Sequence, residues 1–215
     1  LSDCSVGNKL VHIGDDDSGR VVCVIAPPLV SYLDTLSLRA LGMKTYRTAN
    51  KLLYHYPHFG LTIIKDNSWH ITYRHPTINK KQPTGHFHQD ELSVTLAIDG
   101  IPILIDPGSY TYTPSPEWRN KFRSSLNHNN VTFGMNGLCI IDLFQLPREK
   151  QKDTSKIEET ERYIFIENCL PSNKLIMGVT GLLMKRKLVF NPVEQKVLIE
   201  DKLFGNSSAS WNLVF

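Results

Sequence analysis

The chain has 215 residues, which is enough for one large domain or for one domain with a helical appendage. Its hydrophobic fraction of 41% and charged fraction of 21% are ordinary for a globular protein, and a net charge of +3 is too small to indicate nucleic acid as a partner. The longest apolar stretch, residues 21–30, contains Pro27 and Pro28, so the sequence predicts no membrane-spanning segment. The cysteines are far apart and form no C-x-x-C pair, which favours free thiols over a disulfide: Cys4, Cys23, Cys139 and Cys169.

The first 57 residues are expected to form an irregular and helical segment. Residues 14–20 make an acidic loop bounded by glycines, but its oxygen ligands lack the spacing of an EF-hand, so a solvated loop is favoured over a calcium site. From residue 29 to about residue 56, apolar side chains recur every three or four positions, which predicts two short helices. Pro27 and Pro28 suit the start of the first helix, and Gly42 suits its end.

After Pro57 the pattern becomes typical of β-strands. Many short strands with no helix between them predict an antiparallel β-sandwich, so the fold class is mainly β with a short N-terminal helical segment. The polar segment 148–160 is expected to be a surface loop. The expected strands are residues 61–64, 69–74, 92–98, 101–105, 130–133, 163–167, 175–179, 184–190, 197–200 and 211–215.

Imidazoles and carboxylates gather most densely in the middle of the chain. His86 and His88 stand two residues apart, so in an extended chain they face the same side. The Asp99-Gly100 pair favours a tight hairpin turn, which would return Asp106 to the neighbourhood of His88. His128 would complete a set of two histidines and one aspartate, which suits zinc with one open or water-filled position. The alternative is that these are unrelated polar groups of the surface or the core.

Four segments of this region carry a recognisable pattern: GHFHQDELS at 85–93, DGIPILIDPGSYTY at 99–112, WRNKFRSS at 118–125 and His128-Asn129. In order and approximate spacing they resemble the heparinase II/III-like family of polysaccharide lyases. The resemblance covers roughly residues 10–215 and is strongest over 58–134. It implies that residues 58–215 form a β-sandwich domain of the supersandwich type, truncated at its C-terminal end. Residues 1–57 would then be the remnant of an upstream α/α toroid domain. Members of the family carry a similar Gly-Asp…Gly-Arg segment near the junction of the two domains, so the resemblance gives residues 14–20 a second interpretation, a place beside the substrate cleft.

The cupins, which also carry a His-x-His pair on a β-barrel, fit less well. Their glutamate follows the second histidine by four or five residues, whereas Glu91 follows His88 by three. Their second motif has Pro-x-Gly, whereas Pro107 and Gly108 are adjacent. The cupin interpretation is therefore rejected.

The resemblance implies β-elimination on a uronic-acid polysaccharide. His86 would be the catalytic residue that faces the cleft, acting as the base or helping to neutralise the substrate carboxylate. His88, Asp106 and His128 would hold a divalent metal, most simply zinc, in a structural role. Asp90 would be a hydrogen-bond partner of these ligands, or only a turn residue at the start of a strand.

Two arginines and two tyrosines are candidates for substrate binding. Arg119 and Arg123 stand four apart, so on a helical turn they would share a face and could bind sugar carboxylates bidentately. An ion pair with Glu117 or another carboxylate is an open alternative. Tyr110 and Tyr112 could stack on a sugar ring, or could be core tyrosines.

The resemblance implies two partners, an acidic polysaccharide substrate and the upstream toroid domain of the same chain. Because the family's catalytic Tyr and Asn sit in the toroid, the 215-residue chain alone is expected to be inactive, within a bacterial parent of the periplasm or cell envelope. The chain begins without Met, which agrees with a piece of a longer protein. Two other functions stay open, a non-catalytic carbohydrate-binding or scaffold module and a metal-dependent hydrolase.

Overall fold

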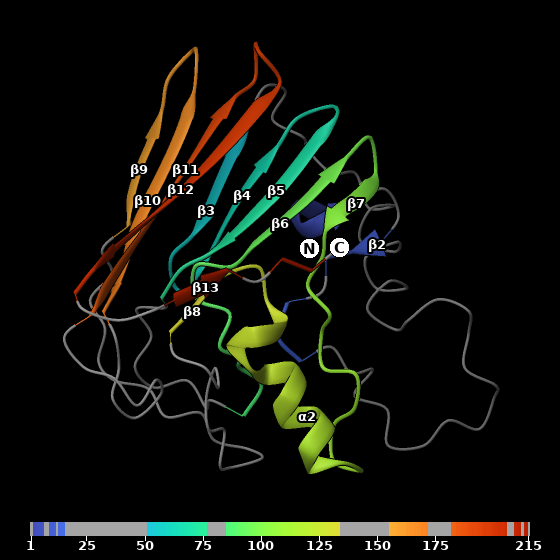
Figure 1. Ribbon diagram of the computed structural model, residues 1–215. Coiled ribbons are helices and arrows are strands. Elements are labelled where there is room, and N and C mark those ends of the chain that lie inside the picture. The colour runs from blue at the N-terminus through green and yellow to red at the C-terminus, as the bar shows by residue number, and fades with distance from the viewer. Residues whose placement is uncertain are drawn as a thin grey trace, which may run out of the picture.

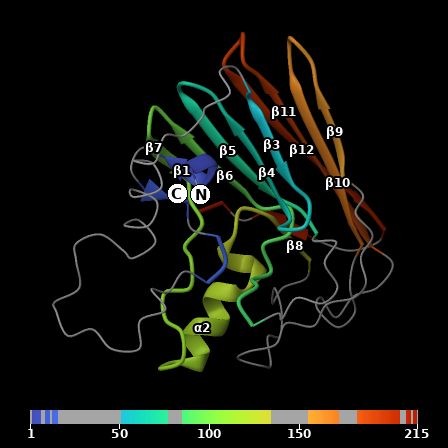
Figure 2. The ribbon, with the colours of Figure 1, turned by 180° about the vertical axis from the view of Figure 1, so that it is seen from behind.

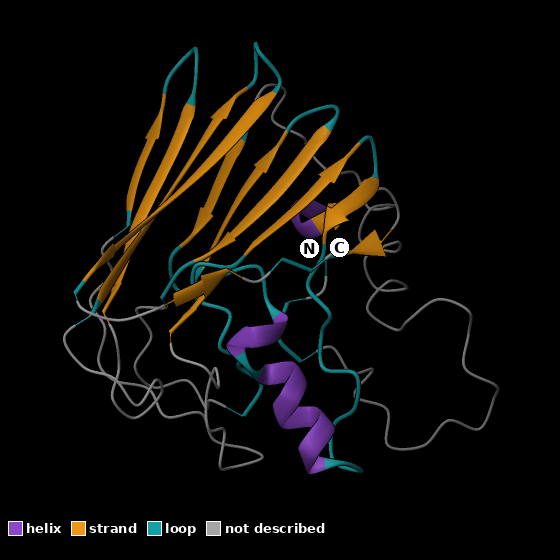
Figure 3. Cartoon of the chain, in the orientation of Figure 1, coloured by secondary structure: helices purple, strands orange, loops and turns teal. Residues whose placement is uncertain are grey.

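The structure, a computed structural model, describes residues 2–6, 9–11, 13–15, 51–76, 85–133, 155–171, 182–205, 209–211 and 213–214. Two antiparallel sheets dominate this part of the chain and lie as two layers (Figure 1). Strand is the main secondary structure throughout, as Figure 3 shows.

The first sheet contains five strands in the order β3-β4-β5-β6-β7. The hairpin between the last two strands turns at Asp99 and Gly100, whose φ angles are 51° and 77°, so the predicted hairpin is confirmed. Its strands are β3 (Leu53–Tyr56), β4 (Leu61–Lys65), β5 (Trp69–Arg74), β6 (Val94–Ile98) and β7 (Ile101–Leu104).

The second sheet contains four strands in the order β12-β11-β10-β9. Every second side chain of β11 is buried, which places one face of this sheet against the interior. Its strands are β9 (Lys156–Glu159), β10 (Ile164–Pro171), β11 (Leu183–Asn191) and β12 (Lys196–Phe204).

One hydrophobic core lies between the two sheets. Ile71 and Tyr73 of β5 belong to the same buried cluster as Ile166 of β10 and Leu188 of β11. Burying each such aliphatic side chain contributes about 1.5–3 kcal/mol relative to leaving it exposed. The core therefore joins the layers, and the predicted antiparallel β-sandwich is confirmed.

A short helix, α2 (Pro116–Arg123), lies beyond one end of the sandwich (Figures 1 and 2). Proline suits the first turn of a helix, and Glu117 suits its positive end. A 3-10 turn, η2 (Ser125–Asn127), then leads into β8 (Val131–Phe133), which pairs with β13 (Ala209–Trp211).

The N-terminal residues are attached to the first sheet. They form η1 (Ser2–Cys4), β1 (Ser5–Val6) and β2 (Lys9–Leu10). The backbone carbonyl of Asp3 lies 2.7 Å from Nε2 of His70 on β5, and Tyr56 on β3 donates a hydrogen bond to the Asp3 carboxylate. Among the helices of the described residues, none is long and apolar enough to cross a membrane.

Two local predictions are corrected by the structure. The helix expected to run to residue 56 is wrong at its end, because 53–56 is strand β3, whose Leu53 belongs to the core. The sandwich therefore begins before the predicted boundary at residue 58. The surface loop expected at 148–160 contains strand β9, which pairs with β10. The expected helices between 29 and 50 and the strand at 175–179 lie outside the described residues.

Candidate active site and metal centre

The segment 85–90 carries both histidines of the His-x-His pair and is fixed by α2. Its backbone bonds to Arg123, whose carbonyl accepts from Gln89 N at 2.9 Å and whose Nε donates to Phe87 O at 3.2 Å. The two histidines differ in environment. The side chain of His86 is 66% exposed, whereas that of His88 is fully buried.

The structure brings together the three predicted metal-binding residues. His88, Asp106 and His128 are all buried, and one possible ligand atom from each lies within 4.8 Å of the others. Metal–ligand bonds of about 2.0–2.2 Å in a tetrahedron separate the ligand atoms by about 3.4 Å, so the widest pair would need to close by about 1.4 Å at most. The convergence predicted from the hairpin is therefore present.

Two imidazole nitrogens of this triad contact no donor or acceptor among the described residues. Nδ1 of His88 and Nε2 of His128 are buried and have no hydrogen-bond partner in the described part of the chain. The opposite nitrogen of each ring contacts a carboxylate. His128 Nδ1 lies 2.8 Å from Asp106, and His88 Nε2 lies 3.0 Å from Asp15. Buried polar atoms are normally satisfied, so two unpartnered nitrogens beside a carboxylate fit a divalent cation that prefers nitrogen and oxygen ligands.

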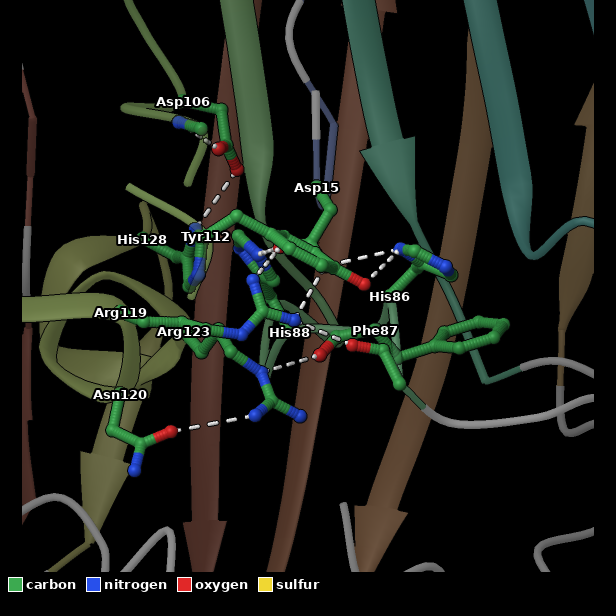
Figure 4. A network of polar contacts seen from close by, with 12 residues as sticks. Asp15, His86, Phe87, His88, Asp106, Tyr112, Arg119, Asn120, Arg123 and His128 are labelled. Carbon is green, nitrogen blue, oxygen red and sulfur yellow. Dashed lines mark hydrogen bonds and ion pairs between the residues drawn. The ribbon is translucent and has the colours of Figure 1, made fainter. Parts of the chain in front are cut away.

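A carboxylate from the N-terminal segment, Asp15, joins the two histidines to α2 (Figure 4). Arg119 binds it bidentately, with Nη1 2.8 Å from Oδ1 and Nη2 2.7 Å from Oδ2. His88 Nε2 lies 3.0 Å from Oδ1, and His86 Nδ1 lies 3.2 Å from Oδ2. The Asp15 side chain is only 1% exposed, so the solvated loop expected at 14–20 is wrong at this residue.

The charges around the triad are set by burial and by close partners. Burial alone would raise the pKa of Asp15, but hydrogen bonds from His88 and Arg119 outweigh it and hold that pKa well below its usual range. Burial lowers the pKa of His88, against the hydrogen bond to Asp15. For His128, burial is outweighed by the Asp106 carboxylate, which raises the pKa. Asp15 is thus ionised and His88 is neutral, the form in which histidine binds metals.

The two arginines predicted to bind sugar carboxylates are fully buried on α2. Arg119 instead forms the open alternative, an ion pair, and its carboxylate is Asp15 rather than Glu117. Arg123 bonds to backbone oxygen and to Oδ1 of Asn120 at 3.3 Å. Their shared face, correctly predicted from the spacing, points into the protein and holds the histidine segment.

The two tyrosines occupy different positions. Tyr112 lies with its ring centroid 4.0 Å from the guanidinium carbon of Arg119 and stacks on His86 with ring centroids 5.6 Å apart. Its hydroxyl lies 3.3 Å from His86 Nδ1. Tyr110 is 72% exposed and stacks on Phe122 of α2 at 5.1 Å. Tyr110 is therefore presented to solvent, whereas Tyr112 supports His86.

Among the described residues, Asp90 makes no hydrogen bond to His88, Asp106 or His128, so the structure favours the second of its two open roles, a turn residue. Its carboxylate accepts from Nε of Arg74 at 2.8 Å and from Nη2 at 3.4 Å, both inside the protein. Asp15, not Asp90, is the carboxylate that hydrogen-bonds to His88.

Apart from Asp15, the residues of this site lie within a region that matches a known domain family. The sequence model named Heparinase II/III-like, C-terminal, matches residues 48–215, which is most of the chain. The chain belongs to the heparinase II/III-like family.

Solved heparinases share the fold of this family member. Heparan sulfate lyase HepC from Pedobacter heparinus superposes with a TM-score of 0.63 at 15% identity, over 96% of this chain and 31% of that one. Heparinase III, the BT4657 gene product, gives a TM-score of 0.60 at 17% identity, over 81% of this chain and 26% of that one. An uncharacterised protein of Borreliella burgdorferi is 36% identical over 80 residues, which are 35% of this chain and 16% of that protein. The chain thus spans a third or less of the length of these relatives.

Two residues of the site were not assigned individual roles from the sequence, although the resemblance allowed the segment of Asp15 a place beside the cleft. Asp15 lies 71 residues before His86, and no local spacing links the two. Arg186 on β11 donates to the backbone carbonyls of Leu92 and Asn129 at 2.6 and 2.7 Å, and it pairs with Asp201. It therefore ties the second sheet to the residue after His128. Only long-range contacts reveal either role.

Proposed function

We propose that this chain forms the β-sandwich half of a polysaccharide lyase active site that cleaves uronic-acid-containing glycans by β-elimination. The observation that carries the proposal is the position of His86. Its imidazole is exposed, hydrogen-bonds to Asp15 and stacks on Tyr112. It is two residues from His88, which belongs to the buried histidine–aspartate triad. Family membership supplies the reaction class.

β-Elimination requires three tasks. A base removes the C5 proton of the uronate, and the electron pair left on C5 forms the C4–C5 double bond as the C4–O bond breaks. The leaving oxygen then takes a proton from an acid, and the adjacent carboxylate must be neutralised because the C5 proton is only weakly acidic. We assign His86 to the first task or to neutralisation, since its Nε2 makes no hydrogen bond to a described residue.

His88, Asp106 and His128 are proposed to hold a divalent metal, with zinc the simplest choice for two imidazoles and one carboxylate. When bound, the ion would add positive charge and link segments that lie far apart in sequence. We assign the three metal ligands a structural role and not a catalytic one. The triad is buried away from solvent, whereas His86 is exposed.

The remaining catalytic groups are proposed to come from a second domain of the same parent protein, an upstream α/α toroid. One fact supports this: the chain covers only 26% and 31% of the solved lyases. The 215 residues alone are then expected to bind glycan without turnover. We place the parent in the periplasm or cell envelope, where polymeric glycans occur, and cell fractionation tests this.

The test is an assay of unsaturated uronate formation by the full-length parent protein, monitored by ultraviolet absorbance. His86→Ala is expected to abolish product with acidic glycans that the wild type cleaves. His58→Ala is the matched control, because His58 is an exposed histidine in the turn between β3 and β4. Glycan binding without turnover by the wild type would instead support the scaffold alternative. Glycan cleavage without unsaturated uronate, lost on metal removal and unaffected by His86→Ala, would support a hydrolase.

A further inference from the structure

The two carboxylate oxygens of Asp15 contact both histidines of the His-x-His pair as well as Arg119. Each of its oxygens contacts one nitrogen of Arg119 and one nitrogen of a histidine: Oδ1 contacts His88 Nε2, and Oδ2 contacts His86 Nδ1. An ionised carboxylate only accepts hydrogen bonds, and a guanidinium only donates them. Both histidine nitrogens that face Asp15 must therefore carry their protons.

This constraint gives the two histidines opposite tautomers. His88 has its proton on Nε2, so its lone pair is on Nδ1, the buried nitrogen without a described partner beside the triad. When its ring is neutral, His86 has its proton on Nδ1 and its lone pair on Nε2, on a ring that is 66% exposed. One carboxylate thus directs one lone pair inward and the other outward.

The backbone of residues 14–15 packs closely against the backbone carbonyl of His86. Asp15 N donates to the carbonyl of His86 at 3.3 Å. Gly14 has a φ of +67°, and a Cβ at this position would lie 2.9 Å from the same carbonyl oxygen. With its carboxylate 1% exposed and its Arg119 partner fully buried, Asp15 is a fixed part of the fold and not a stand-in for a substrate carboxylate.

We propose that Asp15 is a positioning residue that sets the tautomers of both histidines, making His86 Nε2 available to substrate and His88 Nδ1 available to a metal. The consequence for catalysis rests on the proposed lyase function, whereas the tautomers themselves do not. Carboxylates that orient a metal-binding or catalytic histidine through its second nitrogen typically contribute about 10–100-fold to affinity or activity.

The direct test is heteronuclear NMR of the imidazole nitrogens in the metal-free 215-residue protein, with signals assigned from His86→Ala and His88→Ala. The wild type is expected to show the Nδ1–H tautomer for His86 and the Nε2–H tautomer for His88. The reverse tautomer at either residue overturns the proposal, and this reading needs no variant of Asp15.

Asp15→Asn tests the cause, because an amide replaces one acceptor oxygen with a donor of the same shape. At least one of the two histidines is expected to change tautomer, and zinc affinity to fall by about 10–100-fold. Asp99→Asn removes the same charge from an exposed turn whose positive φ asparagine tolerates, and it should change neither. Unchanged tautomers in Asp15→Asn overturn the proposal.

A catalytic arm separates this inference from the proposed function. In the full-length protein, Asp15→Asn is expected to lower kcat by about 10–100-fold with little change in KM, unlike Asp99→Asn. If the wild type shows the expected tautomers but has no lyase activity, the positioning role of Asp15 is supported and the proposed function fails. The reverse tautomers in an active lyase would overturn the positioning role alone.

Discussion

Replacing His88 should remove the response of the protein to zinc. A ligand that binds only the native state stabilises it by roughly 2.7 kcal/mol when its free concentration is a hundredfold above the dissociation constant. For a chain of this size, each kcal/mol raises Tm by about 2–4 °C, so zinc should raise the Tm of the wild type by about 5–11 °C. His88→Ala deletes one of two imidazoles in a triad whose ligand atoms lie within 4.8 Å, so the rise should disappear.

The assay is thermal unfolding of chelator-treated protein with and without zinc, in which each variant is compared with its own metal-free Tm. This comparison cancels the cost of the cavity that the substitution leaves. His86→Ala is the matched control, because its side chain is exposed and lies outside the triad, and it should keep most of the rise. Equal rises in His88→Ala and the wild type, or loss of the rise in His86→Ala, would refute the assignment of ligands.

Three further outcomes can be measured by urea denaturation. Gly14→Ala and Gly100→Ala should each lower the free energy of unfolding by about 1–2 kcal/mol because alanine is strained at a positive φ. Gly14→Ala should lower it further, because its Cβ would lie 2.9 Å from His86 O. Equal losses in the two variants would contradict this. Arg186→Met should lower the free energy of unfolding by about 3–5 kcal/mol by removing the guanidinium that pairs with the buried Asp201 carboxylate, and a loss below about 1 kcal/mol would argue against that role. Burial lowers the pKa of His70, so the unfolded state binds more protons than the folded state just below pH ~6.5. The free energy of unfolding of the wild type, relative to that of His70→Gln, should therefore fall as pH falls from ~7.5 to ~5.5. A difference that does not change with pH would exclude this linkage.

The parts of the fold that depend on local chemistry could be predicted from the sequence. The Asp99-Gly100 pair gave the hairpin because both residues accept positive φ, and that hairpin carried Asp106 back to His88. Strand β3 was missed because leucines near its start also fit a helical period, and its pairing with β4 decided the outcome.

Contacts between distant segments could not be predicted in the same way. The spacing of Arg119 and Arg123 gave their shared helix face, but whether that face meets solvent or protein depends on segments elsewhere in the chain. Asp15 is 104 residues from Arg119, and the acidic residues that follow it in the sequence favour a solvated loop. A buried ion pair between such distant residues has no local signature, because either residue alone is typical of a surface.

The origin of Asp15 has a practical consequence for how this domain is divided from its neighbours. The matched family region starts at residue 48, after the segment that supplies the carboxylate. A protein trimmed to that boundary would keep every strand of both sheets but would lose the Asp15 carboxylate that pairs with the buried guanidinium of Arg119. Breaking such a pair costs about 3–5 kcal/mol, a large share of the stability of a typical domain. The smallest unit that can be excised intact is therefore longer than the unit that sequence similarity outlines.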